Sequence, residues 1–175
     1  MMNDFEVYSI WIIGPSASGK TSVSLDLYSK IKKIPIVIID GDVMRKIYGN
    51  SFGYDKISRS KNTLRYAALV SWLQKFGISS IVSVISPFQE DRDECRKIIK
   101  NYFEVYLNCS LETRIKRDKK DIYKSALEGR RKDVVDVDIP FEQPLRCDLV
   151  LNSENQKPEI LSQELFNEIS KKYSI

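Results

Sequence analysis

The segment Gly14-Pro15-Ser16-Ala17-Ser18-Gly19-Lys20-Thr21 constrains the fold of this chain more than any other feature. It fits the pattern GxxxxGK[ST] and stands between an apolar run at 7–13 and an amphipathic stretch at 21–31. In this context the pattern predicts a strand, a loop whose backbone N–H groups bind nucleotide phosphates, and a helix. We expect Lys20 to reach the β- and γ-phosphates and the Thr21 hydroxyl to bind Mg²⁺. The sequence therefore predicts nucleoside triphosphate binding with Mg²⁺ as cofactor.

The rest of the chain alternates apolar runs with amphipathic stretches. Further strands are expected at 35–39, 78–85, 103–107 and 149–151, and further helices at 58–76, 91–100, 111–118 and 158–173. Such alternation indicates a mostly parallel sheet with helices on both faces. We expect an α/β three-layer sandwich of the P-loop nucleoside triphosphate hydrolase-like class, with residues 1–175 as one domain. The charged segment 114–144, here called the lid segment, is expected to form a basic lid.

The composition excludes several kinds of chemistry. The chain has no histidine, which removes zinc sites with imidazole ligands, Ser-His-Asp triads and histidine phosphotransfer. The net charge is only +4, and acidic residues interrupt the basic cluster, so no nucleic-acid partner is indicated. Three cysteines without a CxxC spacing fit a reducing compartment. Because no signal-peptide pattern or membrane-length apolar stretch is present, we expect a cytoplasmic protein with no membrane partner.

Three polar clusters follow predicted strands, at 14–21, 40–45 and 86–92. Parallel topology brings the carboxyl ends of these strands to one edge of the sheet. A small-molecule kinase needs an acceptor site beside the γ-phosphate and a lid that excludes water. Asp42 and Arg45 supply a carboxylate and a cation for such a site, whereas the NKxD motif of many GTPases is absent. A kinase is the favoured interpretation, and a non-catalytic nucleotide-binding regulatory protein is a remote alternative.

Further motifs occur in order along the chain. They are Asp40-Gly41-Asp42-Val43-Met44-Arg45, Gly53-Tyr54, Arg59-x-x-Asn62, Ile85-Ser86-Pro87-Phe88 with Asp91-Arg92, Arg117-Asp118-x-Lys120-x-x-Tyr123-Lys124-x-Ala126, and Asp138-x-Pro140-Phe141-Glu142-x-Pro144. Each motif is weak alone, but the ordered set resembles the adenylylsulfate (APS) kinase family over nearly the whole chain. The resemblance implies transfer of the γ-phosphate of ATP to a ribose 3′-hydroxyl, with Mg²⁺, by a homodimer.

The resemblance also implies roles for individual residues. Asp42 would act as general base or orient the 3′-hydroxyl, although by itself it would equally fit a helix N-cap. Arg45 and Arg59 would bind the anionic 5′ group of the acceptor, and Asn62 would add amide hydrogen bonds. Other implied acceptor-site residues are Tyr54, Ile85, Ser86, Phe88, Lys120, Asp133 and Val134. The transferring phosphoryl group would be stabilised by Lys20, Lys120 and Arg117, and Arg117 would also contribute to nucleotide binding.

Some of these positions have a second interpretation. A phosphoserine intermediate has been proposed at the position of Ser86 in some relatives, but direct in-line transfer needs none. Ser86 precedes Pro87 and would also suit a turn that ends a strand. Tyr54 and Phe88 would pack against the acceptor nucleoside or simply belong to the core.

The sequence departs from the family at the pocket for the acceptor base. The family carries a lid aromatic, in a pattern like Asn-Phe-Thr-Gly-Ile-Asp, that sandwiches adenine with the aromatic residue matching Tyr54. Here the segment reads Asp133-Val134-Val135-Asp136-Val137-Asp138, and valine cannot stack on a purine. We therefore favour cytidine diphosphoramidate, from bacterial capsule biosynthesis, as the acceptor nucleotide. The alternative is a true APS kinase that makes 3′-phosphoadenylyl sulfate in sulfate assimilation.

Overall fold

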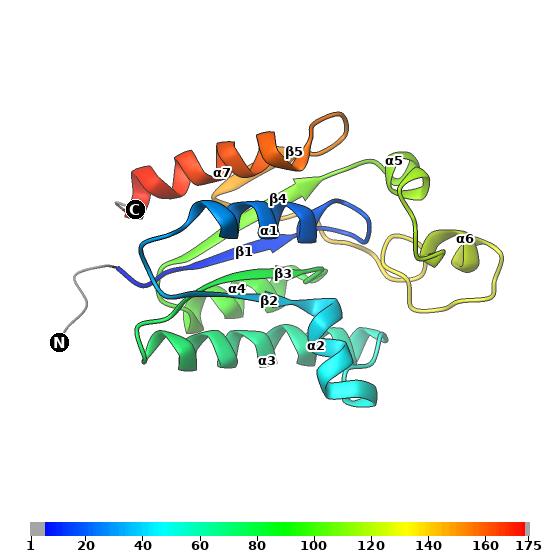
Figure 1. Ribbon diagram of the computed structural model, residues 1–175. Coiled ribbons are helices and arrows are strands. Elements are labelled where there is room, and N and C mark those ends of the chain that lie inside the picture. Colours follow the sequence, from blue (N-terminus) through cyan, green and yellow to red (C-terminus); the bar gives the residue numbers. More distant parts are fainter. Residues whose placement is uncertain (1–5, 174–175) are drawn as a thin grey trace.

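A five-stranded sheet forms the centre of the computed structural model, which describes residues 6–173 (Figure 1). Its strands are β1 (Ser9–Ile13), β2 (Ile36–Asp40), β3 (Ser79–Val84), β4 (Tyr102–Asn108) and β5 (Leu149–Asn152). They lie in the order β2-β3-β1-β4-β5, and every neighbouring pair is parallel. The predicted parallel α/β sheet is therefore confirmed.

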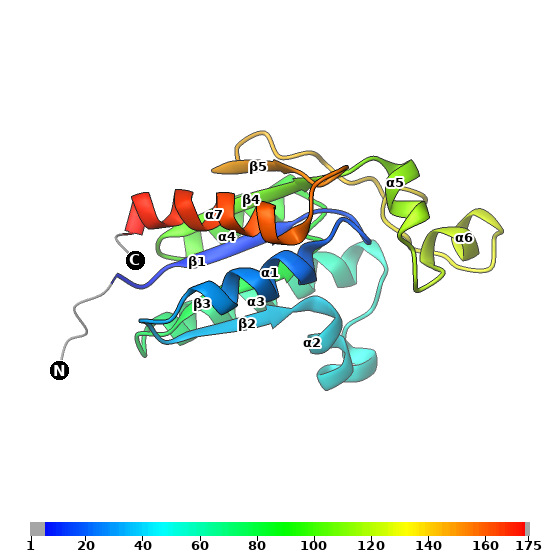
Figure 2. The same ribbon diagram turned by 45° about the horizontal axis from the view of Figure 1, so that its top comes forward.

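Helices cover both faces of this sheet, as Figures 1 and 2 show from two directions. One face carries α1 (Lys20–Lys30) and α7 (Pro158–Tyr173), and the other carries α3 (Lys56–Gln74) and α4 (Gln89–Ile98). Successive β1 residues point to opposite faces. Ile10 therefore joins the cluster that contains Leu27 and Leu165, while Trp11 joins the cluster that contains Val70 and Cys95. These two clusters bury the central strands on both sides, which confirms the three-layer P-loop architecture.

The remaining helices lie at the carboxyl ends of the strands. They are α2 (Gly41–Tyr48), the 3₁₀ turn η1 (Gly49–Ser51), α5 (Leu111–Lys116) and α6 (Ile122–Leu127). Figure 1 shows α5, α6 and the following loop projecting from this end of the sheet. Helix α6 was not predicted, because a six-residue helix that buries only Tyr123 and Ala126 is too short to show apolar periodicity in the sequence. The single-domain organisation stays a prediction.

Most predicted boundaries agree with the structure to within two residues. Helix α3 begins at Lys56 rather than Ser58, because the Asp55 side chain accepts a hydrogen bond from the Ser58 N–H at 2.9 Å and caps the helix. All three cysteines are free thiols. Among residues 6–173, no helix combines the length and apolar character needed to cross a membrane.

Candidate active site

The phosphate loop connects the end of β1 to the start of α1. Gly19 is the N-cap of α1 and has a φ of 98°, in the left-handed region that glycine tolerates best. A Cβ atom on Gly14 would lie 2.9 Å from the Leu107 carbonyl oxygen and 3.0 Å from Ser18 Oγ. The two glycines of the motif are therefore required by the backbone shape and by close packing on β4.

Lys20 lies in the first turn of α1 and folds back over the loop. Its Nζ donates a hydrogen bond to the Pro15 carbonyl oxygen at 2.7 Å and a longer one to Ser18 Oγ at 3.5 Å. Burial lowers the pKa of Lys20 to about 8, although the charges of Asp42 and Asp40 act in the opposite direction. This poorly hydrated ammonium group can exchange its carbonyl partner for phosphate oxygens.

Asp40, the last residue of β2, links the phosphate loop to α2. Its Oδ2 accepts a hydrogen bond from Thr21 Oγ1 at 2.7 Å, and its Oδ1 accepts from the N–H groups of Asp42 and Val43 at 2.9 and 3.3 Å. The N-cap of α2 is thus Asp40, so the alternative interpretation of Asp42 as an N-cap is wrong. Sequence reasoning gave Asp40 no role, and only its place at a strand end pointed to one.

Asp42 stands in the first turn of α2, where its carboxylate is exposed. Lys120 of the lid segment donates a hydrogen bond to it and forms an ion pair. Burial acts to raise the pKa of Asp42, but the Lys120 hydrogen bond and the charges of Lys120, Lys20 and Arg45 hold it below its usual value. The carboxylate is therefore ionised at neutral pH and lies between the phosphate loop and the lid segment.

Tyr54 lies in the loop before α3 and is 46% exposed, so it is not a core residue. The guanidinium carbons of Arg45, Arg59 and Arg131 lie 4.3, 5.7 and 5.5 Å from the centroid of its ring. Within residues 6–173, Tyr54 has no aromatic neighbour in stacking or edge contact. Sequence reasoning did not single out Arg131, which belongs to the lid segment.

Two predicted acceptor residues hold the backbone next to Tyr54, and a third holds the backbone of the lid segment. Arg45 Nη1 donates to the Gly53 carbonyl oxygen at 2.7 Å, and Asn62 Nδ2 donates to the same oxygen at 3.4 Å. Arg59 is only 6% exposed, and its Nη2 donates to the Asp133 carbonyl oxygen at 2.7 Å. The structure therefore brings Arg45, Arg59, Asn62 and Asp133 together, across 74 residues of sequence in the case of Arg59 and Asp133.

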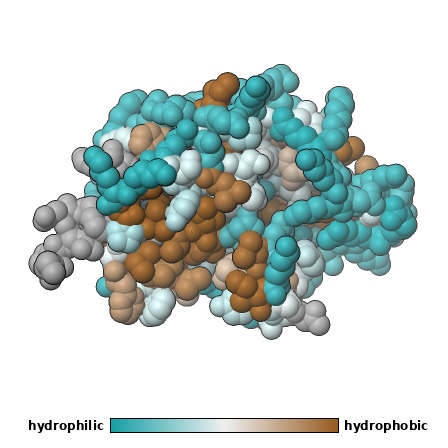
Figure 3. All heavy atoms as spheres, viewed as in Figure 1, coloured by the Kyte–Doolittle hydropathy of each residue, from teal (hydrophilic) through white to brown (hydrophobic). Residues whose placement is uncertain are grey.

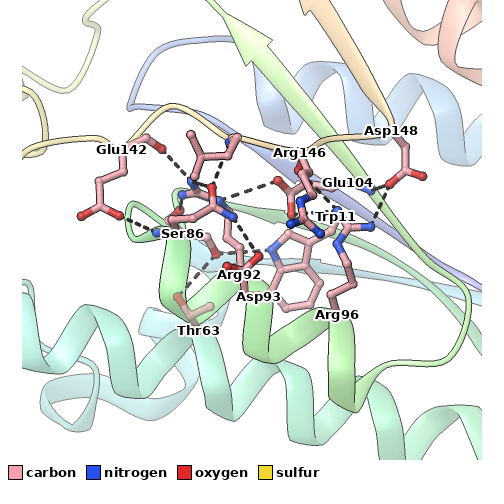
Figure 4. Close-up of polar contacts among 12 residues, drawn as sticks. Trp11, Thr63, Ser86, Arg92, Asp93, Arg96, Glu104, Glu142, Arg146 and Asp148 are labelled. Carbon is pink, nitrogen blue, oxygen red and sulfur yellow. Dashed lines mark hydrogen bonds and ion pairs between the residues drawn. The ribbon is translucent and has the colours of Figure 1, made fainter.

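Ser86 follows β3 and faces the protein interior (Figure 4). It has a φ of 42° and is 3% exposed, with its Oγ 3.3 Å from Trp11 Nε1 and 3.4 Å from Thr63 Oγ1. Its carbonyl oxygen accepts from Arg92 Nη1 at 2.8 Å, and the Nη2 of the same arginine donates to the Glu142 carbonyl oxygen at 2.7 Å. This geometry favours the strand-ending turn and joins it to the far end of the lid segment.

Apolar acceptor-site positions pack differently from each other. Phe88 is 7% exposed and packs with Val135 and Ile139, against which the partly buried Ile85 also lies. Val134 is 3% exposed and packs with Tyr123 and other apolar residues of the lid segment, and against Ala17 of the phosphate loop. This burial argues against the acceptor contact predicted for Val134. Another residue of the lid segment, Arg131, places its guanidinium carbon 5.5 Å from the centroid of the Tyr54 ring.

Arg114 anchors the lid segment to the phosphate loop. This buried side chain donates to Tyr123 Oη at 2.6 Å and to Asp136 Oδ2 at 2.7 Å, and Tyr123 Oη donates to the Ser16 carbonyl oxygen at 3.0 Å. Arg117, at the end of α5, donates to a backbone carbonyl oxygen in the loop after β5 at 2.7 Å. Sequence reasoning missed Arg114, since nothing distinguishes it from the other basic residues of its cluster.

Comparisons with known proteins agree with this geometry. The model of the adenylylsulphate kinase family matches residues 6–152. The cytidine diphosphoramidate kinase of Campylobacter jejuni is 37% identical over 165 residues, covering 90% of this chain and 96% of that protein. A probable adenylyl-sulfate kinase of Archaeoglobus fulgidus is 37% identical over 150 residues, covering 84% and 96%. The structure of the Mycobacterium tuberculosis APS kinase with AMPPNP and APS superposes with a TM-score of 0.88, at 28% identity and with coverage of 94% and 98%.

Proposed function

Because the chain belongs to the adenylylsulfate kinase family, it is a nucleotide kinase, and we propose that its acceptor is cytidine diphosphoramidate. The observation that carries this choice is the environment of Tyr54. Three guanidinium groups surround its ring, and among the described residues no second aromatic ring stands ready to sandwich a purine. The similarity to the Campylobacter jejuni enzyme supports the same acceptor.

The proposed reaction moves one phosphoryl group in a single step. The acceptor's ribose 3′-oxygen forms a bond to the γ-phosphorus of ATP as the bond from that phosphorus to the β,γ-bridging oxygen breaks, and ADP leaves. Asp42 orients the 3′-hydroxyl and takes its proton as the new bond forms. Lys20 and Lys120 stabilise the negative charge of the transferring group. Ser86 is not phosphorylated in this scheme, in keeping with its buried hydroxyl.

The residues beside the phosphate loop fit a magnesium ion. Thr21 Oγ1 and Asp40 Oδ2 are hard oxygen donors 2.7 Å apart, and Mg²⁺ commonly takes one or two protein oxygens together with water and substrate phosphates. Within residues 6–173, no cluster of three or more acidic, histidine or cysteine side chains offers a separate metal site. When bound with ATP, the ion would neutralise charge on the β- and γ-phosphates. Thr21 would bind it, and Asp40 would hold Thr21 in place.

A comparison of two acceptors, each assayed separately, tests the choice of substrate. The purified protein is given ATP and Mg²⁺ with cytidine diphosphoramidate or with APS, and ADP release and the 3′-phosphorylated product are measured. We expect kcat/KM to be more than tenfold higher for the cytidine nucleotide. A kcat/KM for APS equal to or above that for cytidine diphosphoramidate would contradict the proposal and favour an APS kinase. An APS kinase is the second candidate because the chain is 37% identical both to the Campylobacter jejuni enzyme and to the Archaeoglobus fulgidus protein.

The proposal includes a homodimer. Figure 3 shows hydrophobic residues gathered over the edge strand β2, between α1 and α3. Tyr28 of α1, Trp72 of α3 and Phe76 in the turn after α3 are 44%, 54% and 63% exposed, and apolar surface of this kind commonly marks a protein interface. Sedimentation equilibrium at micromolar protein concentration is expected to give twice the mass of one chain. The substitution Trp72→Glu is expected to lower the measured mass toward that of the monomer. A wild-type monomer would contradict this part of the proposal.

A further inference from the structure

Arg131 is the residue of the lid segment whose cationic side chain lies near the Tyr54 ring. It follows α6, is half-buried, and places its guanidinium carbon 5.5 Å from the ring centroid. Arg45 from α2 and Arg59 from α3 approach the same ring. Three elements that are distant in the sequence thus bring their guanidinium groups to one place.

Within the described part of the chain, no direct ion pair neutralises this cluster, although the carboxylates of Asp133 and Asp42 act on Arg59 and Arg45 from a greater distance. Among residues 6–173, no carboxylate lies within 4.0 Å of the side-chain nitrogens of Arg45, Arg59 or Arg131. Arg59 is 94% buried, and its Nε has no hydrogen-bond partner. Burial and then the charge of Arg45 lower the pKa of Arg59 to about 10; the charge of Asp133 acts in the opposite direction, and Arg131 adds a smaller lowering. Neighbouring guanidinium groups, one of them with a buried unpartnered donor, are chemically suited to bind an anion.

We propose that Arg131 is an acceptor-binding residue that completes, with Arg45 and Arg59, a site for the doubly charged tail of the acceptor nucleotide. The inference rests on one part of the proposed function, namely that the acceptor is a nucleoside with two linked anionic groups at its 5′ end. A guanidinium fork binds such oxygens with two parallel hydrogen bonds. Because Arg131 belongs to the lid segment, the acceptor's own tail helps to hold the lid segment over the reacting groups.

Binding is tested apart from catalysis. The protein is first saturated with Mg²⁺ and a non-hydrolysable ATP analogue, so that the phosphate loop is occupied, and is then titrated calorimetrically with CDP, APS or cytidine. Arg131→Ala is compared with the wild type and with Arg130→Ala. Arg130 is a matched control because its guanidinium group is already engaged with Glu128 and Asp121. The unfolding temperature of each variant is measured in parallel.

We expect Arg131→Ala to weaken CDP and APS binding about tenfold or more, and Arg131→Lys to restore part of it. Arg130→Ala should bind both within twofold of the wild type, and cytidine binding should not depend on Arg131. Equal CDP and APS affinity in Arg131→Ala and the wild type would overturn the inference. A loss of cytidine binding as large as that of CDP would also overturn it, since Arg131 would then contact the base. A wild-type preference for APS over CDP would instead count against the proposed acceptor and leave the anion site standing.

Discussion

The hydroxyl of Thr21 donates a hydrogen bond to the carboxylate of Asp40 across 2.7 Å, although 19 residues separate them in the chain. The other carboxylate oxygen caps α2, which carries Asp42 and Arg45. One buried side chain therefore sets the position of the phosphate loop relative to the acceptor side of the site. Any change at Asp40 acts on both.

Substitutions of Asp40 should separate its capping role from its charge. Asp40→Asn keeps an oxygen that can accept the backbone N–H bonds, whereas Asp40→Ala loses the cap and leaves the N–H groups unpartnered. We expect Asp40→Ala to lower the free energy of unfolding by about 1–2 kcal/mol and Asp40→Asn by less. Both should require more Mg²⁺ for half-maximal activity. Urea unfolding measures the stability effect, and titration with Mg²⁺ measures the effect on activity. A urea unfolding midpoint of Asp40→Ala equal to that of the wild type would disprove the capping role.

Replacement of Asp42 by Asn should remove catalysis and spare nucleotide binding. The amide cannot accept the proton of the 3′-hydroxyl, so kcat is expected to fall by roughly 10²–10⁴-fold. The ATP dissociation constant should stay within about twofold, because Asp42 does not belong to the phosphate loop. Turnover and equilibrium binding are measured on the same preparation. Wild-type turnover in Asp42→Asn would show that the carboxylate does not have the proposed role.

ATP affinity should fall as the pH rises through about 8. The free protein has a Lys20 pKa of about 8, so the ammonium group is mostly charged at pH 7 and mostly neutral at pH 9. Bound phosphates favour the charged form and raise that pKa, so binding takes up a proton in this range. We expect the dissociation constant to rise about tenfold between pH 7 and 9. Calorimetry in buffers of different ionisation enthalpy checks the proton uptake, and a flat profile would contradict it.

The buried ion pair of Arg92 and Glu104 should be costly to break. Their Nε and Oε1 atoms are 3.7 Å apart, both side chains are at most 1% exposed, and Arg92 also holds the Ser86 and Glu142 carbonyl oxygens. Arg92→Ala leaves the Glu104 carboxylate without this partner, and we expect a loss of about 3–5 kcal/mol in the free energy of unfolding. Arg96→Ala is the control, because Arg96 is one-third exposed and should cost far less. Equal urea midpoints for the two variants would contradict this.

Patterns within a short stretch of sequence predicted most of the fold. The apolar runs located all five strands of the described residues, and the GxxxxGK[ST] pattern located the loop and the start of α1. Contacts between distant segments could not be predicted in this way. The bond from Arg59 to the Asp133 backbone spans 74 residues, and the ion pair between Arg114 and Asp136 joins a helix to a loop whose path had no periodic signal.

At the acceptor site too, sequence motifs predicted individual residues but not the contacts between distant segments. The motifs predicted Asp42 and Arg45, and the structure places both on α2, with Asp42 close enough to Lys20 and Arg45 to feel their charges. The position of Val134 in a motif suggested a pocket wall, but three-dimensional packing turns that side chain into the lid segment. Arg131 has no motif to identify it and emerges only from its distance to Tyr54.

The ion pair between Lys120 and Asp42 has a consequence for the cell's ATP supply. While no acceptor is present, the carboxylate that would otherwise activate a nearby water molecule is already occupied by a lysine. We therefore expect water that enters beside a bound triphosphate to meet no free base, and idle hydrolysis to be slow. In the proposed reaction an acceptor hydroxyl would displace the lysine from Asp42, and the released ammonium group could then interact with the transferring phosphoryl group.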